Sequence, residues 1–180
     1  MQALEKVQAL EMQAALFTDL GGRGQQLPPA VRVPSQYKIP VLKVSMVKEG
    51  VLSSEMHSVG NPRDTADLLM PMLRHEDREH LVAVLLDTKN KVLAVNTVSV
   101  GDLSSSIVHP REVMKPAIIA GAASIIISHN HPSGDPTPSP EDVTVTKRLI
   151  QAGEILGVEV LDHIIIGDGV FVSMKERGLI

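Results

Sequence analysis

The chain has 180 residues, of which 43% are hydrophobic and 21% are charged, and its formal net charge is −4. This is the composition of an ordinary folded domain and excludes an intrinsically disordered chain. The absence of cysteine excludes disulfides, thiolate zinc sites and a cysteine nucleophile. The acidic balance and the 2% aromatic content also argue against a nucleic-acid surface, which needs basic side chains and stacking platforms.

Residues 1–36 are predicted to be an N-terminal helix followed by a linker. Residues 2–16 contain no Gly or Pro and place apolar side chains at helical spacing. Gly21-Gly22-Arg23-Gly24 and several prolines after it then indicate a linker. The apolar stripe of the helix needs a partner surface, so a homodimer or a docked partner is one expectation.

No targeting or membrane signal is evident along the chain. Acidic and basic side chains interrupt the N-terminal region where a signal peptide needs an apolar stretch, and no apolar run approaches the roughly 20 residues of a membrane span. We therefore expect a cytoplasmic protein without a membrane partner.

Residues 37–57 are predicted to hold a strand that leads into the core. The evidence is a loose alternation over Ile39–Met46, in which Leu42, Val44 and Met46 share one face of an extended segment. Residues 58–180 are then predicted to form one domain.

In residues 58–180 strands and helices alternate. The helices are predicted at Asp64–Leu73, at Pro140–Leu156 and from Pro110 or Arg111 to Ala120. The strands are predicted at His80–Leu86, Lys91–Val100, Ala123–Ser128, Val158–Ile166 and Val170–Ser173. Short turns join the first two strands and the last two strands into hairpins. We expect an α/β fold of the α+β type, with a mixed sheet flanked by helices.

The residues that carry chemistry lie in the segment from Ile127 to Val143. His129 and His131 follow an apolar strand, and side chains two apart on an extended segment point the same way. Both imidazoles can therefore meet one ion, in a loop that several prolines stiffen. The alternative explanation is a pair of solvated or hydrogen-bonded histidines, because a His-x-His pair alone is a weak signal.

Ser139 and Asp142 also have an interpretation that requires no metal. Serine at the N-cap, proline at the next position and acids in the first turn make a favourable helix N-terminus. The two interpretations are compatible, because a helix that begins beside the strand edge also brings Asp142 near the histidines. Three protein ligands would leave a fourth position for water, as in catalytic zinc sites.

The spacing of these residues resembles a known motif. His129-x-His131-Pro132, six residues, Ser139, two residues and Asp142 match the JAMM motif of MPN/JAB zinc metallopeptidases. The phrases that begin at His109, Ser128 and Val160 look like the RadC branch of that superfamily, over residues 58–180. The resemblance implies an MPN/JAB fold with a cytidine-deaminase-like architecture.

The same resemblance implies a role for each residue. His129, His131 and Asp142 would bind one Zn²⁺ per chain together with a water. Glu79, at the start of a core strand, would take the water's proton. Ser139 would stabilise the oxyanion of the tetrahedral intermediate.

Other polar residues leave alternatives open. Without the resemblance Glu79 is an ordinary solvated acid, and Glu76, Asp77 and Glu112 compete for its role. Asp162-His163, in an apolar strand, is either a satisfied polar pair or a partner that orients a metal ligand. His109 precedes a predicted helix, and capping is its simplest role.

The resemblance implies a zinc-dependent metallohydrolase that cleaves an amide bond in a peptide or isopeptide-linked protein substrate. The alternative is a binding module without protease activity, associated with DNA repair or processing. Full-length RadC proteins carry a helix-hairpin-helix module before the JAB domain, and residues 1–55 do not resemble one. With the net charge of −4, this lowers the expectation of DNA contact.

Overall fold

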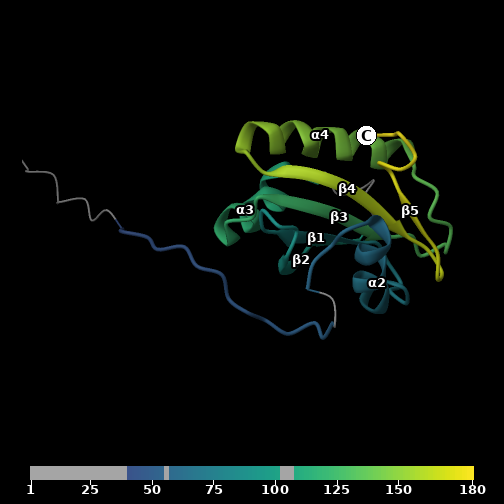
Figure 1. Ribbon diagram of the computed structural model, residues 1–180, viewed down its shortest axis with the longest axis horizontal. Coiled ribbons are helices and arrows are strands. Elements are labelled where there is room, and N and C mark those ends of the chain that lie inside the picture. Colours follow the sequence, from purple (N-terminus) through teal and green to yellow (C-terminus); the bar gives the residue numbers. More distant parts are fainter. Residues whose placement is uncertain (1–39, 55–56, 102–107) are drawn as a thin grey trace, which may run out of the picture. The chain divides into compact units, whose positions relative to one another are not determined.

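The computed structural model describes residues 40–54, 57–101 and 108–180 (Figure 1). The regular elements of the described residues lie in one compact unit, Lys43–Ile180. In chain order they are α2 (Pro62–Leu73), β1 (His80–Leu86), β2 (Val92–Val100), α3 (Pro110–Ala120), β3 (Ser124–Asn130), α4 (Pro140–Leu156), β4 (Glu159–Ile166) and β5 (Phe171–Ser173). Each element predicted in residues 58–180 is confirmed, with boundaries shifted by no more than two residues.

The strands form one mixed sheet in the order β2-β1-β3-β4-β5. Strand β1 is antiparallel to both β2 and β3, whereas β3 and β4 are parallel. A parallel pair needs a crossover connection, and α4 supplies it. The mixed sheet flanked by helices confirms the predicted fold class.

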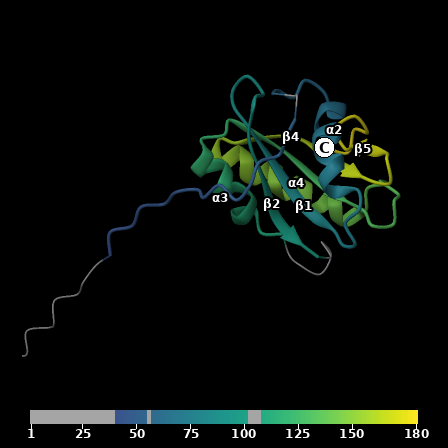
Figure 2. The same cartoon turned by 90° about the horizontal axis from the view of Figure 1, so that it is seen from below.

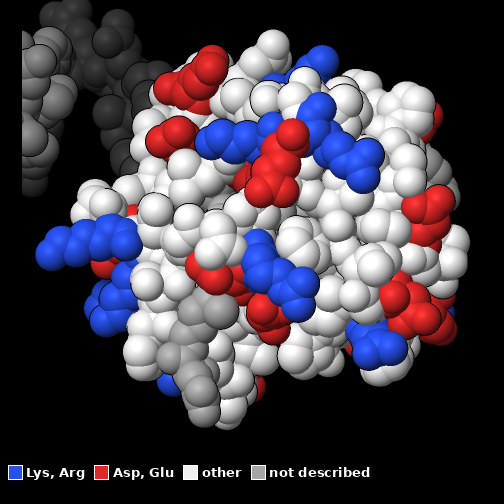
Figure 3. Space-filling model, turned by 45° about the vertical axis from the view of Figure 1, so that its right-hand side comes forward, with Lys and Arg blue, Asp and Glu red and all other residues white. Residues whose placement is uncertain are grey.

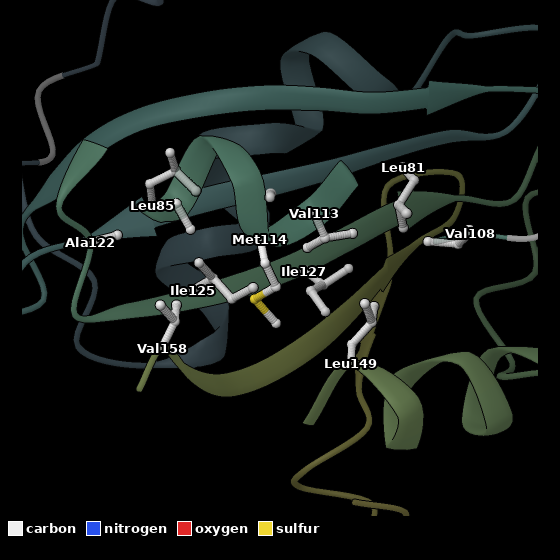
Figure 4. Packing of buried hydrophobic residues seen from close by; sticks show 12 residues of the cluster. Leu81, Leu85, Val108, Val113, Met114, Ala122, Ile125, Ile127, Leu149 and Val158 are labelled. Atoms are coloured by element: carbon white, nitrogen blue, oxygen red, sulfur yellow. The ribbon is translucent and has the colours of Figure 1, made fainter. Parts of the chain in front are cut away.

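The two faces of the sheet carry separate hydrophobic cores. In Figure 1, α4 lies on one side of the sheet and α2 on the other. Alternate residues of β1 and β3 supply both cores, because successive side chains of a strand point to opposite faces. Leu81, Ile125 and Ile127 pack with α3 and α4 (Figure 4). Val82, Val84 and Ile126 pack with α2.

The ends of the helices are made by local sequence. Helix α2 begins at Asn61, whose side chain accepts from the amide of Asp64 in a capping box. Helix α4 begins at Ser139 in the same way and ends at Gly157, whose φ of 70° suits glycine.

Views from two directions show α3 toward one end of the sheet and α2 with β5 toward the other (Figures 1 and 2). No helix in the described ranges is long and apolar enough to cross a bilayer.

The strand predicted over Ile39–Met46 is wrong for residues 40–46, which are irregular and exposed. Val41 is 99% exposed and Val44 is 70% exposed. Alternating side chains make a strand only where a neighbouring strand pairs and a core covers one face. Among the residues that the structure describes, no strand of the sheet pairs with this segment. The predictions for residues 1–36 lie outside the described residues.

Helix α4 and strand β4 meet at a glycine that leaves no room for a side chain. A Cβ built on Gly153 would lie 2.3 Å from the carbonyl oxygen of Val158. The same two residues share a backbone hydrogen bond of 3.0 Å from the Val158 amide to the Gly153 carbonyl. The backbone of α4 at Gly153 therefore packs directly on the backbone of Val158, the residue before β4.

Substitution Gly153→Ala tests this close approach. Alanine favours a helix over glycine by about 1 kcal/mol, but the backbone oxygen cannot move without shifting β4. We expect the clash to dominate, so that the free energy of unfolding in urea falls by a net ~1–2 kcal/mol. Gly50→Ala is the matched control, because an added Cβ there meets nothing within 4 Å. Equal stability of the two variants would contradict the prediction.

Candidate metal centre

The two histidines of the motif come together where β3 ends. His129 is the penultimate residue of β3, and His131 follows the strand by one residue. Their Nε2 atoms lie 2.9 Å apart. His129 alternates along β3 with Ile125 and Ile127, so its ring lies on the same face of the sheet as theirs, the face that α4 covers. The predicted convergence of the two imidazoles is therefore present.

The first turn of α4 adds a carboxylate to this pair. Asp142 Oδ1 lies 3.3 Å from His129 Nε2, and Asp142 Oδ2 lies 3.5 Å from His131 Nε2. Within the described residues these three side chains form a group whose ligand atoms all lie within 4.8 Å of one another. His129 is fully buried, and Asp142 is 6% exposed.

The spacing suits a small metal ion. Around a tetrahedral Zn²⁺ with bonds of about 2.0–2.1 Å, neighbouring ligand atoms lie about 3.3–3.4 Å apart. The two imidazole nitrogens lie 2.9 Å apart and Asp142 Oδ1 lies 3.3 Å from His129 Nε2, so these two separations are close to that value. Two imidazole nitrogens and a carboxylate are also ligands that zinc takes in proteins. The residues present therefore fit the ion that the motif implies.

Asp142 serves the helix cap and the ligand group at the same time. Its Oδ2 accepts from the backbone amide of Ser139 at 2.8 Å and from the Ser139 hydroxyl at 2.7 Å. Its own amide donates to Ser139 Oγ at 3.1 Å, which completes the capping box. Because these side-chain bonds use Oδ2, Oδ1 remains turned toward His129. The geometry is compatible with both interpretations, because the capping box is present and Asp142 also lies beside the two histidines.

His131 is held from the side opposite its Nε2. Its Nδ1 donates to the carbonyl oxygen of Asp135 at 2.7 Å. Since a carbonyl can only accept, Nδ1 carries a proton, and in the neutral ring the lone pair therefore lies on Nε2. The His131 amide also donates to the carbonyl of Ile166 at 2.8 Å, which ties the start of the loop to β4.

A chain of buried hydrogen bonds fixes the tautomer of His129. Thr146 Oγ1 donates its proton to the Asp142 carbonyl at 2.6 Å, so it can only accept from His163 Nδ1 at 2.5 Å. His163 Nε2 then carries the lone pair and accepts from His129 Nδ1 at 2.8 Å. This assignment leaves Nε2 of His129 unprotonated and aimed at the ligand group.

The structure separates the two interpretations of Asp162-His163. His163 is the partner that orients a potential metal ligand. Asp162 is a satisfied structural carboxylate: it accepts from Ser173 Oγ, from the His163 amide and from the Lys175 amide. Sequence reasoning missed Thr146, although its position four residues after Asp142 places it on the same face of α4.

Burial and charge set the protonation of the group. Burial, together with the charge of His163, holds the pKa of His129 well below its ordinary value. Burial also lowers the pKa of His163 to about 4. The hydrogen bond with Asp142 raises the pKa of His131. Burial alone would raise the pKa of Asp142, but the hydrogen bonds with His131 and Ser139 outweigh it and keep that pKa low.

Ser139 contacts the ligand group directly, whereas Glu79 acts on it through its charge. Glu79 is half-buried immediately before β1, and its charge is one contribution that raises the pKa of His131. It is not one of the three grouped ligands. The Ser139 hydroxyl is occupied in the capping box of α4. The roles of both residues in catalysis stay predictions.

The three acids that were alternatives to Glu79 as the base lie close to basic side chains or to a histidine. Glu76 lies 3.4 Å from the ring of His80, and Asp77 lies 3.2 Å from Arg78. Glu112 lies 2.9 Å from Lys115 in the exposed first turns of α3. His109 occupies the N-cap of α3 but makes no side-chain cap bond, so the capping interpretation holds for its position alone.

Fold and site together define a class. The molecule is a mixed α/β domain with a candidate His-His-Asp metal centre at the carboxyl end of its central strand. A family model, the RadC-like JAB domain, matches residues 59–179, and the chain belongs to this family.

The curated relatives are UPF0758 proteins of bacteria. The chain is 63% identical over 119 residues to one from Desulforamulus reducens, which covers 66% of this chain and 52% of the relative. It is 61% identical over 122 residues to one from Moorella thermoacetica, covering 68% of this chain and 53% of the relative. The chain therefore spans about half the length of the curated relatives it matches.

Substitution Thr146→Val tests the hydrogen-bond chain behind His129. Valine keeps the shape of threonine but removes the acceptor for His163 Nδ1, so the ring of His129 loses its fixed tautomer. We expect zinc affinity to fall about 10–100-fold, measured by competition with a chelator at pH 7. Thr144→Val is the matched control, because that hydroxyl makes the same bond to a preceding helix carbonyl on the exposed face. Equal loss in both variants would contradict the prediction.

Acid should destabilise the metal-free domain through His163. The unfolded chain takes up a proton near the ordinary histidine pKa of about 6.5, whereas folded His163 does so only near pH 4. Stability is therefore complete above about pH 6.5 and is lost as pH falls toward 4. Between pH 7 and 5 the loss from this group is about 2 kcal/mol. Urea unfolding with a chelator present should show a smaller loss for His163→Gln, and an equal loss would refute the assignment.

Proposed function

We propose that the chain is a zinc-dependent metallohydrolase of the JAMM type that cleaves an amide bond, in a peptide or an isopeptide-linked protein. The observation that carries the proposal is the convergence of three ligand atoms from His129, His131 and Asp142. Each imidazole donates from its far nitrogen, so when both rings are neutral their near nitrogens present lone pairs to one point. A purely structural histidine pair would gain nothing from opposing lone pairs, whereas a cation is stabilised by them.

The proposed chemistry divides between the ion and the chain. A bound Zn²⁺ would polarise the carbonyl of the substrate and lower the pKa of water to about 7. Glu79 would accept a proton from the attacking water and deliver it to the leaving amine. The carbon–oxygen bond forms in the first step, and the carbon–nitrogen bond breaks as the amine takes the proton. The charge of Glu79 acts on His131, which supports this role.

Ser139 would donate to the oxyanion, a contribution typically worth about 10²–10³ in rate. In the structure its hydroxyl donates to Asp142 Oδ2 at 2.7 Å. The amide of Ser139 donates to the same oxygen at 2.8 Å. The hydroxyl could therefore turn to the substrate while the backbone amide keeps Oδ2 partnered.

The DNA-binding alternative has less support. On the face that Figure 3 shows, basic and acidic side chains are interspersed. A DNA-binding surface usually gathers lysine and arginine on one face or along one helix. Salt-dependent DNA binding by the purified protein would favour this alternative over the hydrolase.

Metal content and one substitution test the proposed function. The purified protein should carry about one zinc per chain, and His131→Ala should lose it, as measured by elemental analysis. Glu79→Gln should keep the metal but reduce turnover about 10²–10⁴-fold, because it removes the proton acceptor without removing a ligand. Turnover is measured on positional-scanning peptide and isopeptide libraries.

The control for this pair is Glu76→Gln, which removes a nearby acid that faces His80. It should retain both zinc and turnover. Loss of zinc in Glu79→Gln would make Glu79 a ligand rather than a base. Unchanged turnover in that variant would remove it from the reaction.

A further inference from the structure

Asn130, the residue between the two histidines, holds the backbone on both sides of Glu79. Its side-chain Oδ1 accepts from the amide of His80 at 2.8 Å, and its Nδ2 donates to the carbonyl of Arg78 at 3.0 Å. The side chain is 2% exposed. Both of its polar ends therefore bind the segment that carries the proposed base.

This bridge replaces a pairing that the backbone does not make there. The register of β1 with β3 begins at the pair Leu81 and His129. The recorded pairing with β1 does not extend to Asn130, and the amide of His131, the next residue, donates to Ile166 in β4. The side-chain carboxamide of Asn130 supplies one donor and one acceptor, as a peptide group would. It thereby extends the contact between β3 and the chain before Leu81 as far as Arg78.

Glu79 is held from its other side as well. The Gly101 amide, directly after β2, donates to the carbonyl oxygen of Glu79 at 2.8 Å. The backbone from Arg78 to His80 thus lies between Asn130 on one side and Gly101 on the other. These bonds reach the Arg78 carbonyl, the Glu79 carbonyl and the His80 amide.

We propose that Asn130 is a positioning residue, which places the carboxylate of Glu79 relative to the metal ligands. The inference rests on the proposed function, in which Glu79 is the base. Successive strand residues point to opposite faces. The end of β3 therefore directs His129 and His131 toward one point and Asn130 toward the base-bearing segment. Any shift of the strand end moves ligands and base together.

The expected consequence is a loss of rate with the metal retained. Asn130 touches no ligand side chain in the described hydrogen bonds, so its removal should leave the ligand set intact. A misplacement of about 1 Å in a catalytic group costs on the order of 10²-fold in rate. A residue that only satisfied buried polar groups would instead affect stability alone.

The first test is amide hydrogen exchange by NMR on the zinc-loaded protein. Asn130→Ala should speed exchange of the His80 and Gly101 amides by about tenfold or more beyond the change expected from global stability. Asn130→Asp keeps the acceptor for the His80 amide but loses the donor to Arg78, so in this variant the Gly101 amide alone should exchange faster, which keeps the test open if alanine prevents folding. Asn61→Ala is the matched control, because it removes a side-chain bond of similar kind at the cap of α2. Unchanged exchange at both amides would overturn the proposal.

The second test is turnover on the substrate found for the wild-type protein. Asn130→Ala should retain about one zinc per chain, lower kcat about 10–100-fold and leave KM within a factor of about three. Combined with Glu79→Gln it should cause no further loss, because both changes act on the same step. Turnover that survives Glu79→Gln overturns the proposed base. Turnover that falls with Glu79→Gln but survives Asn130→Ala overturns this inference alone.

Discussion

The contact between the first turn of α4 and the end of β3 is the one on which the site depends. Strand β3 delivers the two histidines, and α4 delivers Asp142 and Thr146. The parallel pairing of β3 with β4 requires a crossover connection, here α4, and the first turn of α4 lies beside the end of β3. Ligands in sheets of this kind favour the carboxyl ends of strands for the same reason. The topology therefore brings the ligand group together.

The cost of this arrangement is concentrated in buried polar groups. Opposed imidazole nitrogens and a carboxylate in a dry environment are unfavourable unless a cation or further hydrogen bonds compensate. The protein supplies such bonds at the Nδ1 atoms, which face away from the ligand group. His163, itself bonded to Thr146, partners His129, and the Asp135 carbonyl partners His131. Sites that a sequence maintains against such a cost are typically functional.

The sequence predicted the parts of the molecule that depend on local patterns. Periodicity and turn residues placed the helices and strands of residues 58–180, and motif spacing singled out the ligand group. The segment 40–46 failed, because alternation predicts a strand only if a neighbouring strand is available to pair with it. Thr146 and Asn130 escaped notice, because threonine and asparagine are common polar residues and only their partners give them a role.

The sequence alone determined the elements, the caps of α2 and α4, and the spacing of His129, His131 and Asp142, since each follows from residues close together in the chain. Tertiary structure decided the strand order, the tautomers of the histidines and the hydrogen bonds that Asn130 and Gly101 make to the backbone around Glu79. The physical reason is distance along the chain. The partner of His129 lies 34 residues away, and the partners of Asn130 lie 50 and 52 residues away. Only the pairing of β3 with β1 and β4 makes them neighbours.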